Sequence, residues 1–252
     1  MTRQLAKTLA VAPLSLLAGL ILLQPKAMAD QLQLTGLKTG FSMGGVYTSP
    51  YLISVNGQPT LMFACDDFTT DISIGHTWTA YEVTLSQVAT NGPQKFKTAV
   101  SVAIPDASGL TTTSHSYTIQ QEYDAAAYLA EQLLTVPSTL SNSTIAGEYS
   151  FAIWQIFYSG AINGYNGNAL TPTQKAAVGG LMTAAFNNTT ALTGMYLYTP
   201  DPLSSSQEFI GFAPGVGITS VPEARTPLLL AFNSLTLCGV LFFLRRRSPR
   251  AS

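Results

Sequence analysis

The chain has 252 residues, of which 46% are hydrophobic and only 10% charged, and its formal net charge is −1. Its charges are unevenly placed, because residues 30–220 hold four lysines against twelve acidic residues and most other basic residues lie near the two ends. An acidic body of this kind lacks the basic surface that binds nucleic acid or anionic lipid. The composition therefore argues against a nucleic-acid partner and is typical of an exported protein.

The first 29 residues have the three-part pattern of a secretory signal peptide. Arg3 and Lys7 precede an apolar core at about residues 9–23, and Ala27 and Ala29 flank Met28 as a small-x-small cleavage site. The alternative is an uncleaved membrane anchor. We expect residues 1–29 to be a signal peptide cut by signal peptidase, which places the body outside the cytoplasm.

The last segment has the pattern of a membrane-spanning helix followed by a positive stop. Residues 227–244 are mostly apolar, and at 1.5 Å per residue a helix of this length just crosses the hydrocarbon core. A triple arginine follows at once, made of Arg245, Arg246 and Arg247. By the positive-inside rule it stays cytoplasmic. Both ends of the chain thus predict the same orientation, with residues 248–252 as a cytoplasmic tail.

Val221, Pro222 and Glu223 precede this helix, and the whole of residues 221–247 resembles a PEP-CTERM sorting signal. The resemblance implies a Gram-negative bacterium and an exosortase-type sorting enzyme that cuts near the Pro-Glu motif. It also implies a path through the inner membrane to the cell surface or extracellular matrix, with exopolysaccharide as a partner. A permanently anchored single-pass envelope protein is the alternative.

The body, residues 30–213, is predicted to be one α+β domain, joined by a connector at residues 214–220 to the tail. The pair Asn56-Gly57 between two apolar runs is a strong hairpin signal. Residues 89–114 are predicted to be loop, with a strand or short helix near residues 96–103. The predicted strands cover residues 46–55, 60–63, 77–85, 116–119, 195–198 and 208–212.

Apolar residues recur at helical spacing in the middle of the body and predict about three helices. The first covers residues 120–134 and ends at Pro137, and the second covers residues 145–157 and is apolar nearly all round. The third starts at Pro172 with Thr171 as its cap. Strands, then helices, then strands indicate antiparallel strands with a helical insertion.

Cys65 is the only cysteine of the body, because Cys238 lies in the apolar tail, so no internal disulfide is expected. Asp66 and Asp67 follow it directly. Two neighbouring acids raise the pKa of a thiol and make it a poor nucleophile. By residue type alone, a small buried residue at a strand end is the favoured interpretation.

The body also resembles the thioester domains of bacterial surface adhesins. In that family a cysteine joins a glutamine to form an internal thioester that amines attack. The glutamine position of the Gln-x-Ala-Ile-Trp helix is Ser150 here, and Gln155 lies on another face of that helix. The resemblance therefore implies the fold without the covalent chemistry, unless another glutamine forms the thioester. It is carried by residues 63–66, residues 123–134 and Ala152-Ile153-Trp154.

No other motif indicates catalysis or a cofactor. His76 and His115 have no partners at metal-ligand spacing, so no metal is expected. Trp78 and Trp154 could stack on sugars, although such residues more often belong to the core. Two hypotheses remain: a non-enzymatic exported surface or matrix protein, and a surface adhesin with a thioester at Cys65.

Overall fold

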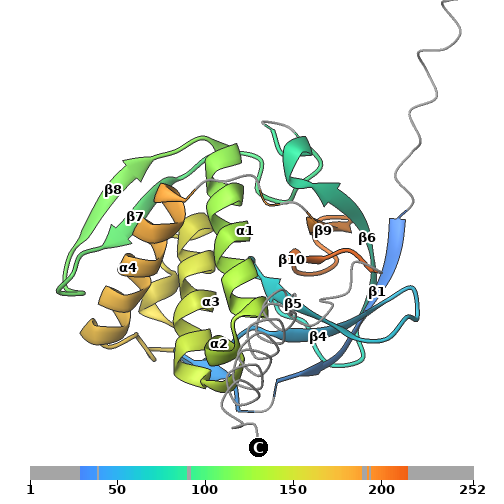
Figure 1. Ribbon diagram of the computed structural model, residues 1–252, viewed down its shortest axis with the longest axis horizontal. Helices are drawn as coiled ribbons and strands as arrows, with labels where there is room; N and C mark the ends of the chain where they lie inside the picture. Colours follow the sequence, from blue (N-terminus) through green and yellow to red (C-terminus); the bar gives the residue numbers. More distant parts are fainter. Residues whose placement is uncertain (1–28, 39, 90–91, 189–191, 193, 215–252) are drawn as a thin grey trace, which may run out of the picture.

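A closed antiparallel barrel lies beside a layer of helices (Figure 1). The computed structural model describes residues 29–214 except 39, 90–91, 189–191 and 193. None of the helices in these residues has an apolar stretch of the length that spans a bilayer.

The predictions for the two ends of the chain fall outside the described residues, with the single exception of Ala29. At the N-terminus this applies to the rest of the signal peptide, including Ala27. At the C-terminus it applies to the membrane helix predicted at 227–244 and to two motifs: the sorting motif of Val221, Pro222 and Glu223, and the positive stop of Arg245, Arg246 and Arg247. These features therefore stay predictions from the sequence.

The barrel has six strands in the order β1-β4-β5-β10-β9-β6, and every neighbouring pair is antiparallel. Strand β1 closes the barrel by pairing with both β4 and β6. The strands are β1 (Ala29–Leu37), β4 (Tyr51–Val55), β5 (Leu61–Cys65), β6 (Thr77–Thr84), β9 (Met195–Asp201) and β10 (Phe209–Phe212).

Alternation of apolar and polar side chains builds the barrel interior. In β1, Leu32 and Leu34 are buried while Gln31 and Gln33 are exposed, as the period of two of a strand requires. Burying these apolar faces is the main force that holds the barrel together. The interior is filled by Leu32, Leu34, Tyr51, Ile53, Val55, Phe63, Cys65, Trp78, Ala80, Tyr198 and Phe209.

The helices cover one outer side of the barrel. Helices α1 (Ile119–Thr135), α3 (Ser143–Phe157) and α4 (Pro172–Asn187) pack together, and α1 and α3 contact β5 (Figure 1). Ala64 and Ile210 point from the barrel into this second core, on the side of their strands opposite to Cys65 and Phe209. Helix α3 is the most buried because it is apolar nearly all round.

Shorter elements complete the fold. Hairpin β7–β8 lies beside α4 (Figure 1). Hairpin β2–β3 turns through Gly44 and Gly45, both with positive φ, as a two-residue hairpin turn requires. These elements are β2 (Ser42–Met43), β3 (Val46–Tyr47), η2 (Leu85–Gln87), β7 (Ser101–Pro105), β8 (Thr112–Ser116), α2 (Pro137–Ser141) and η3 (Ala161–Asn163).

The structure confirms a mixed fold of helices and antiparallel strands and corrects several details. The strand predicted at residues 116–119 is wrong, because Thr118 forms a capping box that starts α1. The described residues hold four α-helices instead of about three, since Pro137 ends α1 and also occupies the first turn of α2. The strand predicted at 46–55 is divided into β3 and β4, and β1 was not predicted.

Candidate functional site

The pairing of β5 with β10 places Cys65 near a glutamine that is distant in the sequence. Cys65 lies opposite Phe209 in the register, and beyond this pair the Asp66 N–H donates to the Glu208 carbonyl at 3.4 Å. The register thus carries Gln207 to a position opposite Asp67, on the same face of the sheet as Cys65.

The side chains of Cys65 and Gln207 bind the same backbone oxygen. The Cys65 thiol donates to the Asp67 carbonyl at 3.3 Å, and the Gln207 Nε2 donates to that same oxygen at 3.2 Å. Sulfur and amide nitrogen are therefore no further apart than the sum of these two distances. Gln207 Nε2 also donates to the Thr70 carbonyl, whereas Gln207 Oε1 is buried with no hydrogen-bond donor among the described residues.

The thiol of Cys65 is fully buried, and burial raises its pKa well above the ordinary value. The carboxylates of Asp67 and Asp66 raise the pKa further, while the hydrogen bond to the Asp67 backbone lowers it. Cys65 is thus a protonated thiol, as the neighbouring acids predict from the sequence. Trp154 Nε1 is itself buried and finds no acceptor among the described residues.

An ion pair fixes the loop that carries the shared carbonyl. Lys95 Nζ lies 2.5 Å from Asp67 Oδ2 and also donates to the Thr70 hydroxyl at 3.0 Å and the Ser206 carbonyl at 2.9 Å. Burial alone would raise the pKa of Asp67, but Lys95 and the loop hydrogen bonds lower it. Lys95 therefore joins the loop after β5 to the residue before Gln207.

Two buried acids, Asp66 and Glu208, lie next to this ion pair. Glu208 accepts hydrogen bonds from the Tyr123 hydroxyl at 2.5 Å, the Lys95 backbone N–H at 2.8 Å and the Thr199 hydroxyl. Both oxygens of Asp66 are buried and receive no hydrogen bond, and burial followed by the charge of Glu208 raises its pKa well above the ordinary value. A protonated Asp66 that donates to Glu208 gives one of its oxygens a partner and removes one of the two buried negative charges.

Ser150 and Gln155, the two residues of α3 weighed for thioester chemistry, have structural roles instead. Ser150 Oγ accepts from the Ser49 N–H at 3.0 Å, and Ser49 Oγ accepts from the Cys65 N–H at 3.0 Å. Gln155 Nε2 donates to the Ala103 and Ser159 carbonyls, at 2.8 and 2.9 Å. Ser150 thus holds the backbone beside Cys65, and Gln155 is bound elsewhere.

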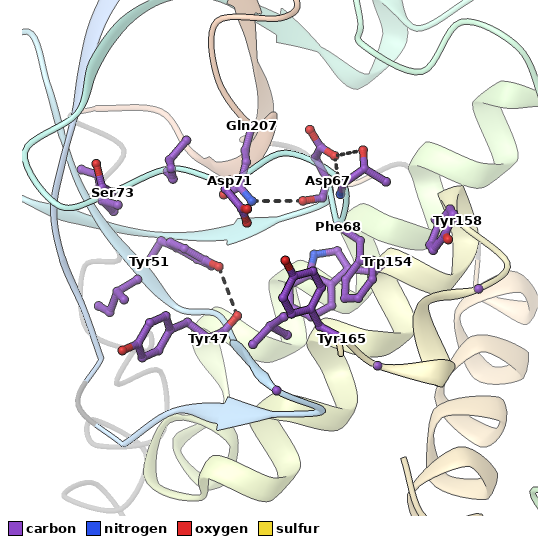
Figure 2. A pocket seen from close by; sticks show the side chains of 18 of the residues that line it. Tyr47, Tyr51, Asp67, Phe68, Asp71, Ser73, Trp154, Tyr158, Tyr165 and Gln207 are labelled. Carbon is purple, nitrogen blue, oxygen red and sulfur yellow. Dashed lines mark hydrogen bonds between the residues drawn. The ribbon is translucent and has the colours of Figure 1, made fainter. Parts of the chain in front are cut away.

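A cavity of about 810 Å³ opens over this site, and Gln207 and Asp67 form part of its wall. Cys65 is not among the lining residues, whereas Gln207 is, although its side chain is largely buried and its Oε1 is fully enclosed. Figure 2 shows Tyr47 and Tyr51 on one side of the cavity, Trp154 and Tyr165 on the other. Asp71 and Gln207 lie along its upper edge in this view.

The structure also places the remaining candidate residues. His76 is partly buried, with Nε2 3.1 Å from the Ser205 carbonyl and its ring stacked on Trp78, whereas His115 lies on exposed strand β8. Trp78 and Trp154 are both core residues, as expected. Within the described part of the chain, no cluster of three or more His, Cys, Asp or Glu side chains could hold a metal ion.

Gln207 is the site residue that the sequence analysis missed. It stands beside the predicted strand 208–212, and only the pairing of that strand with β5 brings it to Cys65. Comparison of the chain with family models, curated proteins and solved structures found no match. The candidate site therefore rests on the motifs in the sequence and on this geometry.

Proposed function

We propose that this chain is an exported, non-enzymatic surface adhesin that forms an internal thioester between Cys65 and Gln207. The observation that supports it is the meeting of the two side chains at the Asp67 carbonyl oxygen. In the sequence the missing glutamine of the α3 motif was the objection to this chemistry, and Gln207 supplies an amide from another element.

Formation of the bond is a simple acyl transfer. The Cys65 sulfur bonds to the Gln207 side-chain carbonyl carbon, the bond from that carbon to Nε2 breaks, and the thiol proton leaves with the nitrogen as ammonia. A primary amine then attacks the same carbon from the cavity. An amide forms at Gln207 and the Cys65 thiol is regenerated, so each molecule reacts once and no turnover occurs.

The environment suits a bond that must survive until an amine arrives. The Cys65 sulfur is enclosed in the barrel and the Gln207 side chain is largely buried, so little water reaches the bond. The acyl carbon belongs to a residue that lines the cavity, so an amine reaches it without opening the barrel. The indole N–H of Trp154, which has no acceptor in the described structure, is available to the thioester carbonyl.

Intact-mass spectrometry of the full chain tests the thioester. A Cys238→Ser background leaves Cys65 as the single thiol, and Gln120→Glu serves as the matched control for Gln207→Glu. We expect the parent and the control to be lighter by one ammonia and to gain one methylamine on incubation, while Cys65→Ser and Gln207→Glu do neither. A parent chain of unreduced mass, with an alkylatable thiol after denaturation, would contradict the proposal.

Export and sorting are proposed from the two ends of the chain. The pattern of residues 221–247 supports cleavage by an exosortase-type enzyme and delivery to the cell surface or extracellular matrix, with membrane anchoring as an intermediate stage. Mapping the mature C-terminus of protein taken from its own cells tests this. An end near Pro222 is expected, and a mature protein that keeps Arg245, Arg246 and Arg247 would instead be permanently anchored.

A further inference from the structure

Large apolar side chains gather around the mouth of the cavity. Tyr47 is 65% exposed, Ile74 63%, Tyr165 50% and Tyr158 45%, and all four line it. Among the described residues only two other large hydrophobic side chains are comparably exposed, Val100 and Leu110. Exposed rings concentrated at one hollow, rather than scattered singly, mark a binding surface.

The charge of the cavity points to the kind of ligand. Its described lining contains two acids, Asp67 and Asp71, and no Lys, Arg or His. Asp67 is buried and paired with Lys95, so its charge is already balanced. Asp71 is exposed on the loop after β5 and accepts no hydrogen bond from another described residue, which leaves a negative site facing the space (Figure 2).

The rings suit the flat faces of sugars. Tyr47 and Tyr165 stand on opposite sides of the cavity, and Phe68 lies behind with its ring stacked 5.7 Å from Tyr158. The negative face of an aromatic ring attracts both the polarised C–H groups of a pyranose and a nearby ammonium group. A cavity of about 810 Å³ is in the range that encloses a ligand larger than one sugar ring.

We propose that the cavity binds a cationic amino-sugar oligosaccharide, one whose sugars carry free primary amines. Rings on Tyr47 and Tyr165 hold the sugar faces, Asp71 attracts the ammonium groups, and Gln207 at the wall receives one amine after it loses its proton. The covalent half of this inference rests on the thioester proposed above. The volume of the cavity, with rings on both sides, favours a sugar over the slender side chain of a lysine in a peptide.

The non-covalent half is tested separately with the full chain carrying Cys65→Ala, which cannot form a thioester. Calorimetry with fully deacetylated glucosamine oligosaccharides is compared with their N-acetylated forms, with neutral cello-oligosaccharides and with an oligolysine peptide. We expect the glucosamine oligomer to bind most tightly. Loss of an exposed ion pair in Asp71→Asn should weaken it about two- to five-fold, whereas Glu131→Gln, which removes a charge outside the cavity, should not.

A ring-deletion series adds a second measure. Tyr165→Ala should weaken the glucosamine oligomer about five-fold, and the affinity of the N-acetylated form should fall in parallel because both sugars use the same ring. Equal affinity for both sugar forms, tighter binding of oligolysine, or no binding of any sugar would overturn the inference.

Covalent capture separates this inference from the proposed function. The chain with Cys65 intact should gain the mass of one glucosamine oligomer. A chain that reacts with methylamine but binds no glucosamine oligomer keeps its thioester and refutes the amino-sugar ligand. Binding to the Cys65→Ala variant, with capture of neither the glucosamine oligomer nor methylamine by the parent, supports the ligand and refutes the thioester.

Discussion

Substituting Lys95 by methionine removes the one positive charge that balances Asp67 in the described structure. The Asp67 side chain is fully buried and that of Lys95 is 15% exposed, and their charged atoms lie 2.5 Å apart. Breaking a buried pair by removing one partner costs about 3–5 kcal/mol, and partial solvent access to Lys95 reduces this to about 2–3 kcal/mol. Lys95→Met should therefore lower the free energy of unfolding by that amount.

Urea unfolding at neutral pH measures the effect, in a Cys65→Ala background so that no thioester contributes. Lys97→Met is the matched control, because Lys97 is exposed and has no ion pair in the described structure. The double variant Asp67→Asn/Lys95→Met should recover most of the loss, because no buried charge then remains without a partner.

The pKa of Asp67 is lowered, so the pair's contribution is present above the ordinary value of 3.8 and is lost as the pH falls through the folded value. A loss below about 1 kcal/mol for Lys95→Met would refute the reasoning, since it would mean that water screens the pair.

Three further substitutions test the buried acids and the barrel core. The pKa of Asp66 is raised, so the protein should lose stability as the pH rises above 3.8. With increasing pH, the urea midpoint of Asp66→Asn should therefore fall less steeply than that of the parent. Burial raises the pKa of Glu122 from 4.5 to about 7, so the parent should lose stability as the pH rises through that range and Glu122→Gln should remove this loss. Equal slopes of stability against pH for the two proteins would contradict this. Phe209→Ala should lower the free energy of unfolding by about 3–5 kcal/mol in thermal or urea unfolding, because the ring is fully buried and packs edge-on against Tyr51 at 5.5 Å. A loss under 1 kcal/mol would mean that the barrel interior collapses around the gap.

Local patterns in the sequence predicted the elements that carry strong signals. The cap at Thr171, the proline at 172 and the apolar run of α3 each act within one helix, and their boundaries follow from them. Hairpin β2–β3 was missed although Gly44-Gly45 is a turn signal of the same kind as Asn56-Gly57. The alternation of Leu32 and Leu34 with glutamines would likewise have found β1.

The candidate site could not be predicted in the same way. Cys65 is a candidate from the sequence because of its neighbours and the resemblance to thioester domains. Its partner, however, depends on which strand pairs with β5 and in which register. A shift of one residue in that register would turn Gln207 to the other face of the sheet. The buried network of Lys95, Asp67 and Glu208 has the same origin, because its members come from three separate segments that only the closed barrel brings together.

The most direct test of the thioester is peptide mapping at acidic pH, where a thioester survives digestion. Pepsin digestion followed by mass spectrometry should find the peptide with Cys65 joined to the peptide with Gln207, at a combined mass lower by one ammonia. Two separate peptides, one with a free Cys65 thiol and the other with an unmodified Gln207 amide, would contradict the account.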